Sequence, residues 1–486
     1  MTVPPVPPSP LPEGFRLVLD ASARQLREDL WFGGSPARVL RLTPAGQTAW
    51  RELGDGAVNT LAAGLLARRF TDAGLAHPVP PAPTELPGLT VVIPVYGRPD
   101  LLGACLSGLD HRHPVLVVDD GSPDSAAIAK VAARHGVTVL RRSTNGGPAA
   151  ARNTALAHVT TELIAFLDSD CVPSPGWAEQ VAGHFADPMV AADAPRVRPL
   201  APRTWAGSYT RAAGSLDLGA QPGRVAPGTR VSFVPTAAFV VRRAALDDVA
   251  RQGMVFDERM RVGEDVDRVW RLHAAGWRIR YDPAVEVEHH EPTTWSGLLR
   301  RRARYGTSAA PLAKRRPEAI APLVLHPWPA LAVAGLLGRR PLLAAGGFGM
   351  AVLTMRGTLR SQDIPTAGVT RAMGTAVSQT WLGVGRYGTQ FAAPALLASL
   401  AVPGRRRWGR RVAVLSLLLG PPLHAWRTRK PELDPVRYTL GSLADDIAYG
   451  SGVWAGCVTE RTAVPLRPRI SRRPLRIERE SKRGTS

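Results

Sequence analysis

Two aspartates close an apolar run of the sequence and could hold a metal ion. The run Leu163–Leu167 is followed by Asp168-Ser169-Asp170, and a carboxylate at the end of a buried strand is costly unless something pairs with it. Residues two apart on an extended chain point to the same side, so the two carboxylates can serve one ligand. Carboxylate oxygens suit a hard divalent cation, Mg²⁺ or Mn²⁺, that also binds substrate phosphates. The spacing predicts a metal site, with a plain turn as the alternative.

Two earlier strand ends carry groups that could bind a nucleotide. The stretch VVIPVYGRP ends an expected strand with Pro94, Tyr96 and Arg98. A tyrosine there can stack on a base and an arginine can bind a phosphate, although Tyr96 would equally suit the core. The next strand ends in Asp119-Asp120, whose carboxylates can accept hydrogen bonds from a nucleobase or a ribose. Helix capping by Ser122 or Asp124 is the alternative, but two adjacent aspartates exceed what a cap requires.

A glycine loop forms a further candidate for anion binding. Asn145-Gly146-Gly147 precedes a helical stretch with Pro148 in its first turn, and Arg152 adds a positive charge one turn in. Helix N-termini bind anions, but the Gly-Lys-Ser/Thr ending of a Walker loop is missing. A simple capped helix is the alternative.

These residues need a scaffold that brings strand ends together. From Leu89 to about Pro311, short runs rich in β-branched residues alternate with helical stretches, which is typical of βαβ units. We therefore expect an α/β fold with a mostly parallel sheet. Ligands of such sheets bind at the carboxyl ends of the strands, where the polar groups stand.

Changes in composition along the sequence divide the rest of the chain into domains, a linker and tails. Before the sheet lies a small domain of strands and helices, in which Thr43 with Pro44 predicts a helix start and Gly74 a helix end. Prolines mark a linker, and the two ends lack a pattern of regular structure. The expected parts are a flexible tail (1–13), the small domain (14–76), a proline-rich linker (77–88), the sheet domain (89–311), an apolar helical region (312–460) and a basic disordered tail (461–486).

The charge and the apolar helices point to an anionic partner. The formal net charge is +21, with a sequence pI of about 11.1, which suits a phosphate-bearing ligand, an anionic membrane or a nucleic acid. The region 312–460 has long apolar runs beside arginine clusters, including 405–411. Only the run 319–338 reaches the length needed to span a bilayer, and prolines interrupt it. We expect association with a membrane surface, with an ordinary helical domain as the alternative.

The motifs occur together in one known family. VVIPVYGRP, VVDDGS, NGGPAAARN, FLDSD and GEDVDRVWR follow one another as in family 2 glycosyltransferases of the GT-A fold, which the chain resembles. The resemblance implies a nucleotide-sugar across the strand ends and a Mn²⁺ or Mg²⁺ cofactor. It assigns nucleotide-sugar binding to Pro94, Tyr96, Arg98, Asp120, Arg152 and Asp168, with uracil at Tyr96 and Asp120, ribose near Asp168 and the metal on Asp170.

The resemblance also assigns the chemistry. Asp265, in Glu264-Asp265 before a helix, corresponds to the base that takes the proton of the acceptor hydroxyl, and one displacement with one base inverts the anomeric centre. Charge at a helix N-terminus is the alternative reading of this acidic pair. In VEVEHHEP, His290 is the expected metal ligand and His289 the alternative, since a strand points only one of them inward.

A later arginine-rich stretch extends the expected acceptor side. RRARYG, at 301–306, is similar to the Gln-Arg-x-Arg-Trp signature of processive synthases, but the Gln and the Trp are replaced. The similarity implies contact of Arg304 with diphosphate. It also implies stacking of Tyr305 or Trp295 on acceptor sugar, and Glu264 is a further acceptor-side candidate.

The small first domain indicates which class of acceptor the enzyme uses. Its order of strands and helices, with LTPAGQTAWREL, resembles winged-helix domains that bind ribosomal peptides by strand addition. With the catalytic domain and the apolar tail, the whole chain resembles the glycosyltransferases of mycofactocin biosynthesis. That implies transfer of glucose from UDP-glucose, β-1,4-linked, onto a small peptide-derived redox cofactor. It also implies a peptide partner at the first domain and no nucleic acid.

Two other functions stay open at this level. One is a membrane glycosyltransferase with a polyprenyl-phosphate or cell-wall acceptor, and the other is a non-catalytic peptide or membrane scaffold. The complete set of aspartates, Asp120, Asp168, Asp170 and Asp265, argues against the scaffold. Three widely spaced cysteines predict no disulfide framework, and we expect the enzyme in the cytoplasm at the inner face of the cell membrane.

Overall fold

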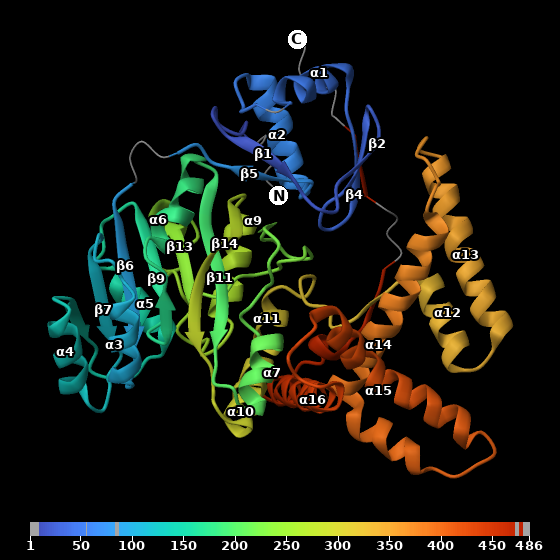
Figure 1. The fold of residues 1–486 in the computed structure, drawn as a ribbon. Helices are drawn as coiled ribbons and strands as arrows, with labels where there is room; N and C mark the ends of the chain where they lie inside the picture. Colours follow the sequence, from blue (N-terminus) through green and yellow to red (C-terminus); the bar gives the residue numbers. More distant parts are fainter. Residues whose placement is uncertain (1–8, 55, 83–86, 472–475, 480–486) are drawn as a thin grey trace. The chain divides into compact units, whose positions relative to one another are not determined.

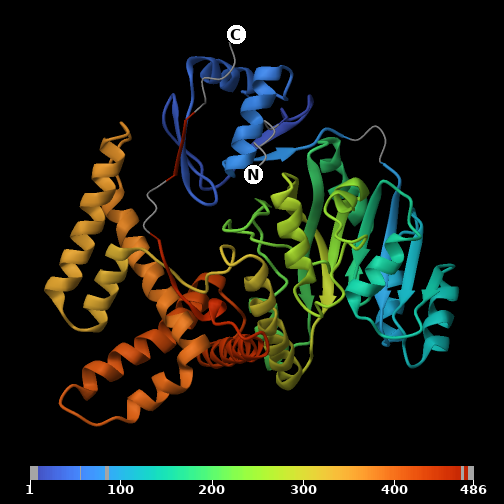
Figure 2. The ribbon, with the colours of Figure 1, turned by 180° about the vertical axis from the view of Figure 1, so that it is seen from behind.

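A computed structural model describes residues 9–54, 56–82, 87–471 and 476–479, and the chain forms two units. The first comprises residues 1–200, 214–290 and 475–486, and the second comprises residues 201–213 and 291–474. Figures 1 and 2 show the elements from two sides.

A nine-stranded mixed sheet is the scaffold of the first unit (Figure 1). β6, β7, β8 and β9 are parallel, as the βαβ pattern predicts, and β13 then joins β9 antiparallel. The strands in spatial order are β10 (Cys171–Pro173), β14 (Arg278–His290), β11 (Val190–Leu200), β13 (Ala238–Arg242), β9 (Leu163–Leu167), β6 (Leu89–Val95), β7 (Val115–Asp119) and β8 (Thr138–Arg141), with β12 (Gly223–Arg224) on β14.

Helices cover the faces of this sheet, and this burial explains why its central strands are largely apolar. All seven residues of β6 are buried, so the strand is a continuous apolar run without alternation. Asp124 caps α4 by accepting a hydrogen bond from the Ala127 N–H at 2.9 Å. The helices are α3 (Pro99–Ser107), α4 (Ser125–Arg134), α5 (Pro148–Leu156), α6 (Trp177–Ala182), the 3₁₀ helix η1 (Gly183–Ala186), α8 (Arg243–Asp248) and α9 (Glu264–Ala274).

The first unit also contains a small N-terminal domain of antiparallel strands and two helices. Thr43 caps the first helix, with Pro44 following it, and Gly74 ends the second at φ 71°, as predicted. The strands β2 and β3 were not predicted. The elements are β1 (Arg16–Leu19), β2 (Arg24–Arg27), β3 (Leu30–Gly33), β4 (Arg38–Arg41), α1 (Pro44–Leu53), α2 (Leu61–Ala73) and β5 (Ala76–Val79).

The expected tails and linker differ from the structure at their inner ends. Leu11 is buried in the core of the small domain, so ordered chain reaches into the expected tail 1–13, whose first eight residues lie outside the described part. The first residues of the expected linker belong to strand β5, which pairs with β1. The expected disordered tail contains η2 (Val464–Leu466), β16 (Arg469–Ile470) and β17 (Arg476–Arg479), while 472–475 and 480–486 lie outside the described residues.

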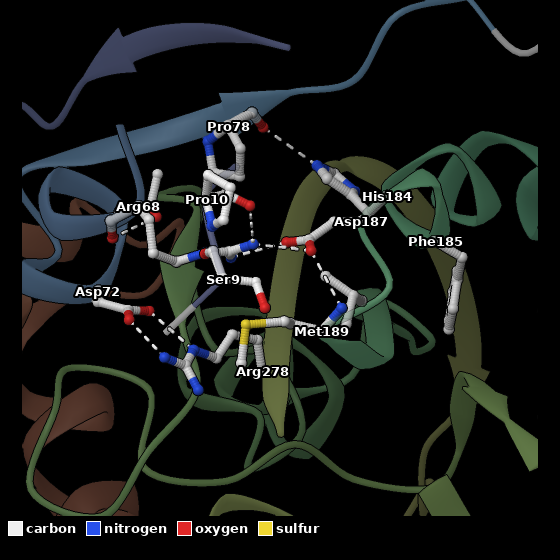
Figure 3. Close-up of polar contacts among 12 residues, drawn as sticks. Ser9, Pro10, Arg68, Asp72, Pro78, His184, Phe185, Asp187, Met189 and Arg278 are labelled. Atoms are coloured by element: carbon white, nitrogen blue, oxygen red, sulfur yellow. Dashed lines mark hydrogen bonds and ion pairs between the residues drawn. The ribbon is translucent and has the colours of Figure 1, made fainter. Parts of the chain in front are cut away.

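Two bidentate ion pairs, one of them fully buried, join the small domain to the sheet domain (Figure 3). Arg68 on α2 makes two hydrogen bonds to the carboxylate of Asp187, at 2.7 and 2.8 Å, and both side chains are 1% exposed. Asp72, one turn further along α2, accepts from Arg278 on β14 at 2.9 and 2.5 Å. Bidentate, desolvated pairs fix geometry strongly, and removing one partner is costly. The small domain is therefore held in a defined position on the nine-stranded sheet.

The second unit is helical, as predicted for the apolar region. One of its described helices, α13, is long and apolar enough to cross a membrane by length and composition. Pro394 lies inside α14, which kinks at Ala392 because proline cannot continue the helical hydrogen bonds. The elements are α7 (Trp205–Ala213), α10 (Trp295–Thr307), α11 (Ala309–Arg315), β15 (Val324–Leu325), α12 (Pro327–Leu337), α13 (Pro341–Arg360), α14 (Val369–Ala401), α15 (Arg407–Arg429) and α16 (Pro435–Thr459).

Candidate active site

The predicted polar groups gather at one edge of the sheet. β9, β6, β7 and β8 are neighbours and run parallel, so their carboxyl ends meet there. Asp119 ends β7, and Asp168 follows β9 directly. The edge is the place where ligands of open α/β sheets bind.

Asp120 holds the glycine loop in place. Its carboxylate accepts hydrogen bonds from the backbone N–H of Gly146 at 3.0 Å and of Gly147 at 2.6 Å, and it pairs with Arg142 at 2.8 Å. Gly147 needs its glycine, since φ is 89°. The loop then opens α5 at Pro148, as predicted. Asp120 thus shapes the site by holding this loop.

Arg152 connects two parts of the site that are far apart in sequence. One terminal nitrogen donates to Asp168 Oδ1 at 2.7 Å and the other to Glu264 Oε1 at 3.0 Å. Its side chain is 3% exposed, and its Nε has no hydrogen-bond partner among the described residues. Arg152 therefore joins the strand end that carries the aspartate pair to the first turn of α9.

Asp265 has the electrostatics of a general base. It lies in the first turn of α9, where its Oδ1 accepts from the Val266 N–H at 2.8 Å. Burial and then the neighbouring charge of Glu264 raise the pKa of Asp265 to about 7, against the pull of Arg268 and Arg152. A carboxylate with a pKa near neutral can accept a proton in the reaction and release it afterwards.

The pH dependence of transfer tests this assignment. A general base acts when ionised, so if Asp265 is that base we expect kcat/KM to rise with pH and to level off above about 7. Glu264→Gln removes a negative charge that raises this pKa, so the rising limb should move to lower pH. Rate profiles of the two proteins over the acid and neutral range measure the shift. A limb that stays in place or moves upward would contradict the assignment.

The second aspartate faces a histidine, and the geometry favours His289 over the expected His290. His289 is 5% exposed and its Nε2 lies 3.4 Å from Asp170 Oδ1, because β14 pairs with β10 so that His289 stands opposite Cys171. His290 contributes its backbone N–H, which donates to the Asp170 carbonyl at 2.8 Å. Strand alternation then points the His290 side chain to the other side.

The donor set fits a divalent cation in part. Asp170 is over a third exposed, and its negative charge, after the effect of burial, raises the pKa of Asp168. A bound cation relieves such repulsion. The described residues hold no group of three or more ligands ready for a metal. Mg²⁺ and Mn²⁺ sites of this kind take their other ligands from substrate phosphates and water.

The first strand end is open to solvent. Tyr96 follows β6 with its side chain 53% exposed, so it is available for stacking, and the core alternative is wrong. Arg98 precedes α3 in a left-handed conformation, φ 56°. Pro94 is buried within β6, where it shapes the strand.

The expected acceptor residues after the strand β14 belong to the second unit. The Trp295 ring packs against Trp205 and Tyr209, with centroids 5.0 and 5.4 Å apart, so much of its surface is used inside that unit. Arg304 is exposed on α10, and the Tyr305 ring lies beneath the Arg301 guanidinium at 5.8 Å. Their roles toward acceptor stay predictions.

Two arginines of the site were not predicted from the sequence. Arg142 pairs with Asp120. Arg142 comes directly after β8 and Asp120 directly after β7, and the ends of adjacent parallel strands lie side by side, so the sequence contained a signal for this pair. Arg268 is fully buried one turn after Glu264, with the Phe239 ring 3.9 Å from its guanidinium carbon. Burial and then Arg152 lower the pKa of Arg268 to about 9. Its charge lies near Asp265 without reaching solvent.

The fold and this edge define the class of protein. The sheet is mostly parallel, with the antiparallel strand β13 in its interior, an aspartate pair at its centre and an acidic pair that opens the helix beyond. These features are those of a glycosyltransferase of the GT-A fold. Residues 90–250 match the family described as Glycosyl transferase family 2.

Known proteins place the chain more closely. It is 38% identical over 478 residues to the pre-mycofactocin glycosyltransferase of Mycobacterium tuberculosis (strain CDC 1551 / Oshkosh), covering 95% of this chain and 98% of that one. It is also 33% identical over 174 residues to the succinoglycan biosynthesis protein ExoU of Rhizobium meliloti, covering 34% of this chain and 50% of that one. The chain belongs to the family 2 glycosyltransferases, and it is an enzyme that transfers a glycosyl group.

The mannosyltransferase of Pyrobaculum calidifontis, solved in complex with GDP-Man and Mn²⁺, is 20% identical with a TM-score of 0.42, covering 75% of this chain and 88% of that one.

Proposed function

We propose that this enzyme transfers glucose from UDP-glucose, with inversion, onto a small peptide-derived redox cofactor, a mycofactocin precursor, and builds a β-1,4-linked oligoglucoside. The observation that carries the proposal is the likeness to the pre-mycofactocin glycosyltransferase over 95% of the chain. The buried cysteines, all free, suit a reducing cytoplasm, where we place the enzyme.

The residues of the sheet edge have distinct tasks in this reaction. Tyr96 stacks on the base, the loop held by Asp120 cradles the nucleotide, and Asp168 binds the ribose. Asp265 takes the proton of the acceptor hydroxyl while that oxygen bonds to the anomeric carbon. The bond from this carbon to the donor phosphate breaks, and the electron pair leaves on the nucleoside diphosphate. A divalent cation on Asp170 and His289 would supply charge stabilisation for that leaving group.

The acceptor is tested by a transfer assay with mass detection. Purified enzyme, Mn²⁺ and UDP-glucose are incubated with the peptide-derived acceptor and, separately, with a polyprenyl phosphate. We expect products heavier by one or more hexose units on the first acceptor only. Label that enters the lipid alone would overturn the proposal, and a screen with UDP-galactose and GDP-mannose tests the donor.

The two adjacent histidines give a matched pair for the metal. We expect His289→Ala to weaken Mn²⁺ binding in the presence of UDP by about tenfold or more, as loss of a ligand or its close support does. His290→Ala, one residue along, should leave the affinity unchanged. Titration of Mn²⁺ followed by its electron paramagnetic resonance signal measures both. The reverse ranking would reinstate His290 as the ligand.

The edge of β4 supports the proposal of a peptide partner. β17, from the far end of the chain, pairs in parallel with β4 and extends the small domain's sheet. An edge that accepts one extended segment can accept another by strand addition, so we propose that a peptide binds at β4 in competition with β17.

Truncation tests this competition. A synthetic peptide with the sequence of residues 474–481 should bind a chain that ends at Ser471 at least about tenfold more tightly than the full chain, because the attached segment acts at a high effective concentration. Fluorescence anisotropy of the labelled peptide measures the difference. Equal affinity for the two chains would refute strand competition at β4.

A further inference from the structure

Two helical hairpins of the second unit bring their turns together. One turn, residues 338–340, joins α12 to α13, and the other, residues 402–406, joins α14 to α15 (Figures 1 and 2). The Arg339 side chain of the first turn reaches the start of α15 (Arg407–Arg429), since a Cβ placed on Gly409 would lie 3.0 Å from Cδ of Arg339. Residues 336–342 and 402–412 thus form one surface, which we call the hairpin-tip patch.

The patch carries a concentrated positive charge. None of its arginines forms an ion pair with any residue that the structure describes, and the only acidic residue of the sequence between Glu318 and Glu432 is Asp363. Arg410 and Arg411 donate hydrogen bonds to carbonyl groups at the end of α14 and not to a carboxylate, so most of their charge remains. The arginines are Arg339, Arg340, Arg405, Arg406, Arg407, Arg410 and Arg411.

Apolar side chains project between these charges. Exposed apolar groups side by side are unusual on a free surface and mark a site of interaction. Trp408 lies among the arginines of the second turn, and tryptophan favours the boundary between water and lipid. The exposed fractions are 60% for Leu336, 89% for Leu342, 50% for Val402, 65% for Trp408 and 64% for Val412.

We propose that the hairpin-tip patch binds the surface of an anionic phospholipid bilayer. The arginines pair with lipid phosphates, and the apolar side chains enter the boundary between headgroups and acyl chains. A nucleic acid would suit the charge but leave the apolar side chains in water. Binding at the surface also fits the lengths, because α12 has 11 residues and a crossing needs about 20, so the hairpin α12–α13 cannot cross as a pair.

Vesicle sedimentation with the full chain tests the patch. We expect binding to vesicles of phosphatidylglycerol and phosphatidylcholine, weakening with added salt, and little binding to phosphatidylcholine alone. The triple variant Arg405→Ser, Arg406→Ser, Arg407→Ser should lower the partition constant about a hundredfold. Its matched control is Arg16→Ser, Arg51→Ser, Arg134→Ser, which removes the same charge from exposed sites of the first unit and should bind nearly as well as the parent.

Two further measurements exclude misfolding of the variant and a purely electrostatic effect as explanations of weaker vesicle binding. Leu342→Ser with Trp408→Ser keeps every charge and should still lower the partition constant. Vesicles should slow amide hydrogen exchange at residues 402–412 of the unaltered chain. Equal losses in the triple variant and its control, or unchanged exchange at the turns, would overturn the proposal. The readouts involve no sugar transfer, so they are independent of the proposed reaction.

Discussion

Replacing Asp265 by asparagine is expected to lower the rate of glycosyl transfer about a thousandfold while UDP binding is kept. Asparagine has the same shape and cannot take the acceptor proton, and loss of a general base costs about two to four orders of magnitude. Single-turnover rates with mass detection measure the loss, and calorimetric titration with UDP and Mn²⁺ measures the binding. Asp124→Asn, at the cap of α4, is the matched control, because asparagine caps equally well and the turnover should not change.

The same variant should not be less stable than the parent above neutral pH. The folded pKa of Asp265, about 7, lies above its value of 3.8 in the unfolded chain, so stability is lost as pH rises from 3.8 to about 7, and the ionised side chain destabilises the fold above that range. The amide has no charge to bury, and the melting temperature at alkaline pH should stay equal or rise. A variant that loses turnover together with its melting temperature would point to a structural role instead. Undiminished turnover would refute the base assignment.

Local sequence was enough for the motifs and for the sheet that carries them. Each motif combines a strand with the polar residues that end it, and parallel βαβ order places those ends at one edge. Asp119, Asp168 and the loop before Pro148 lie there for that reason. The helix caps at Thr43 and Asp124 are equally local, since a cap involves only a few neighbouring residues.

Contacts between distant segments could not be predicted in the same way. Alternation shows that only one of two adjacent histidines faces Asp170, but the register of β14 on β10 decides which one. The strands β2 and β3 are four residues each, too short to establish a period. The buried carboxylate of Asp187 binds Arg68, which lies 119 residues away in the sequence. No local pattern near either residue predicts this ion pair.

Arg152 is the clearest case, because its sequence context indicates an anion site while its contacts are protein carboxylates. The helix start and the glycines suggested that Arg152 binds a nucleotide directly. Its two terminal nitrogens instead donate to Asp168 and Glu264, and the side chain is nearly enclosed. We propose that it acts as a positioning residue, which sets the ribose-side aspartate and the base-bearing helix at a fixed separation.

Replacing Arg152 by methionine should therefore damage both stability and transfer. The change leaves two carboxylates without their donor, and breaking a buried ion pair in this way costs about 3 to 5 kcal/mol. Chemical denaturation measures the free energy of unfolding. The exposed Arg259, paired with Asp257 on the surface, gives the matched control, and Arg259→Met should leave the melting temperature unchanged.

A second substitution separates positioning from simple loss of charge. Adding Glu264→Gln to Arg152→Met removes one of the stranded carboxylates, so part of the lost stability should return, and the two changes should be non-additive. Transfer should stay low, because the link between Asp168 and α9 is still absent. Arg152→Lys keeps the charge but cannot reach both carboxylates with a rigid fork, so it should recover more stability than activity. Additive losses in the double variant would show that the bridge between Asp168 and Glu264 does not couple the two sides of the site.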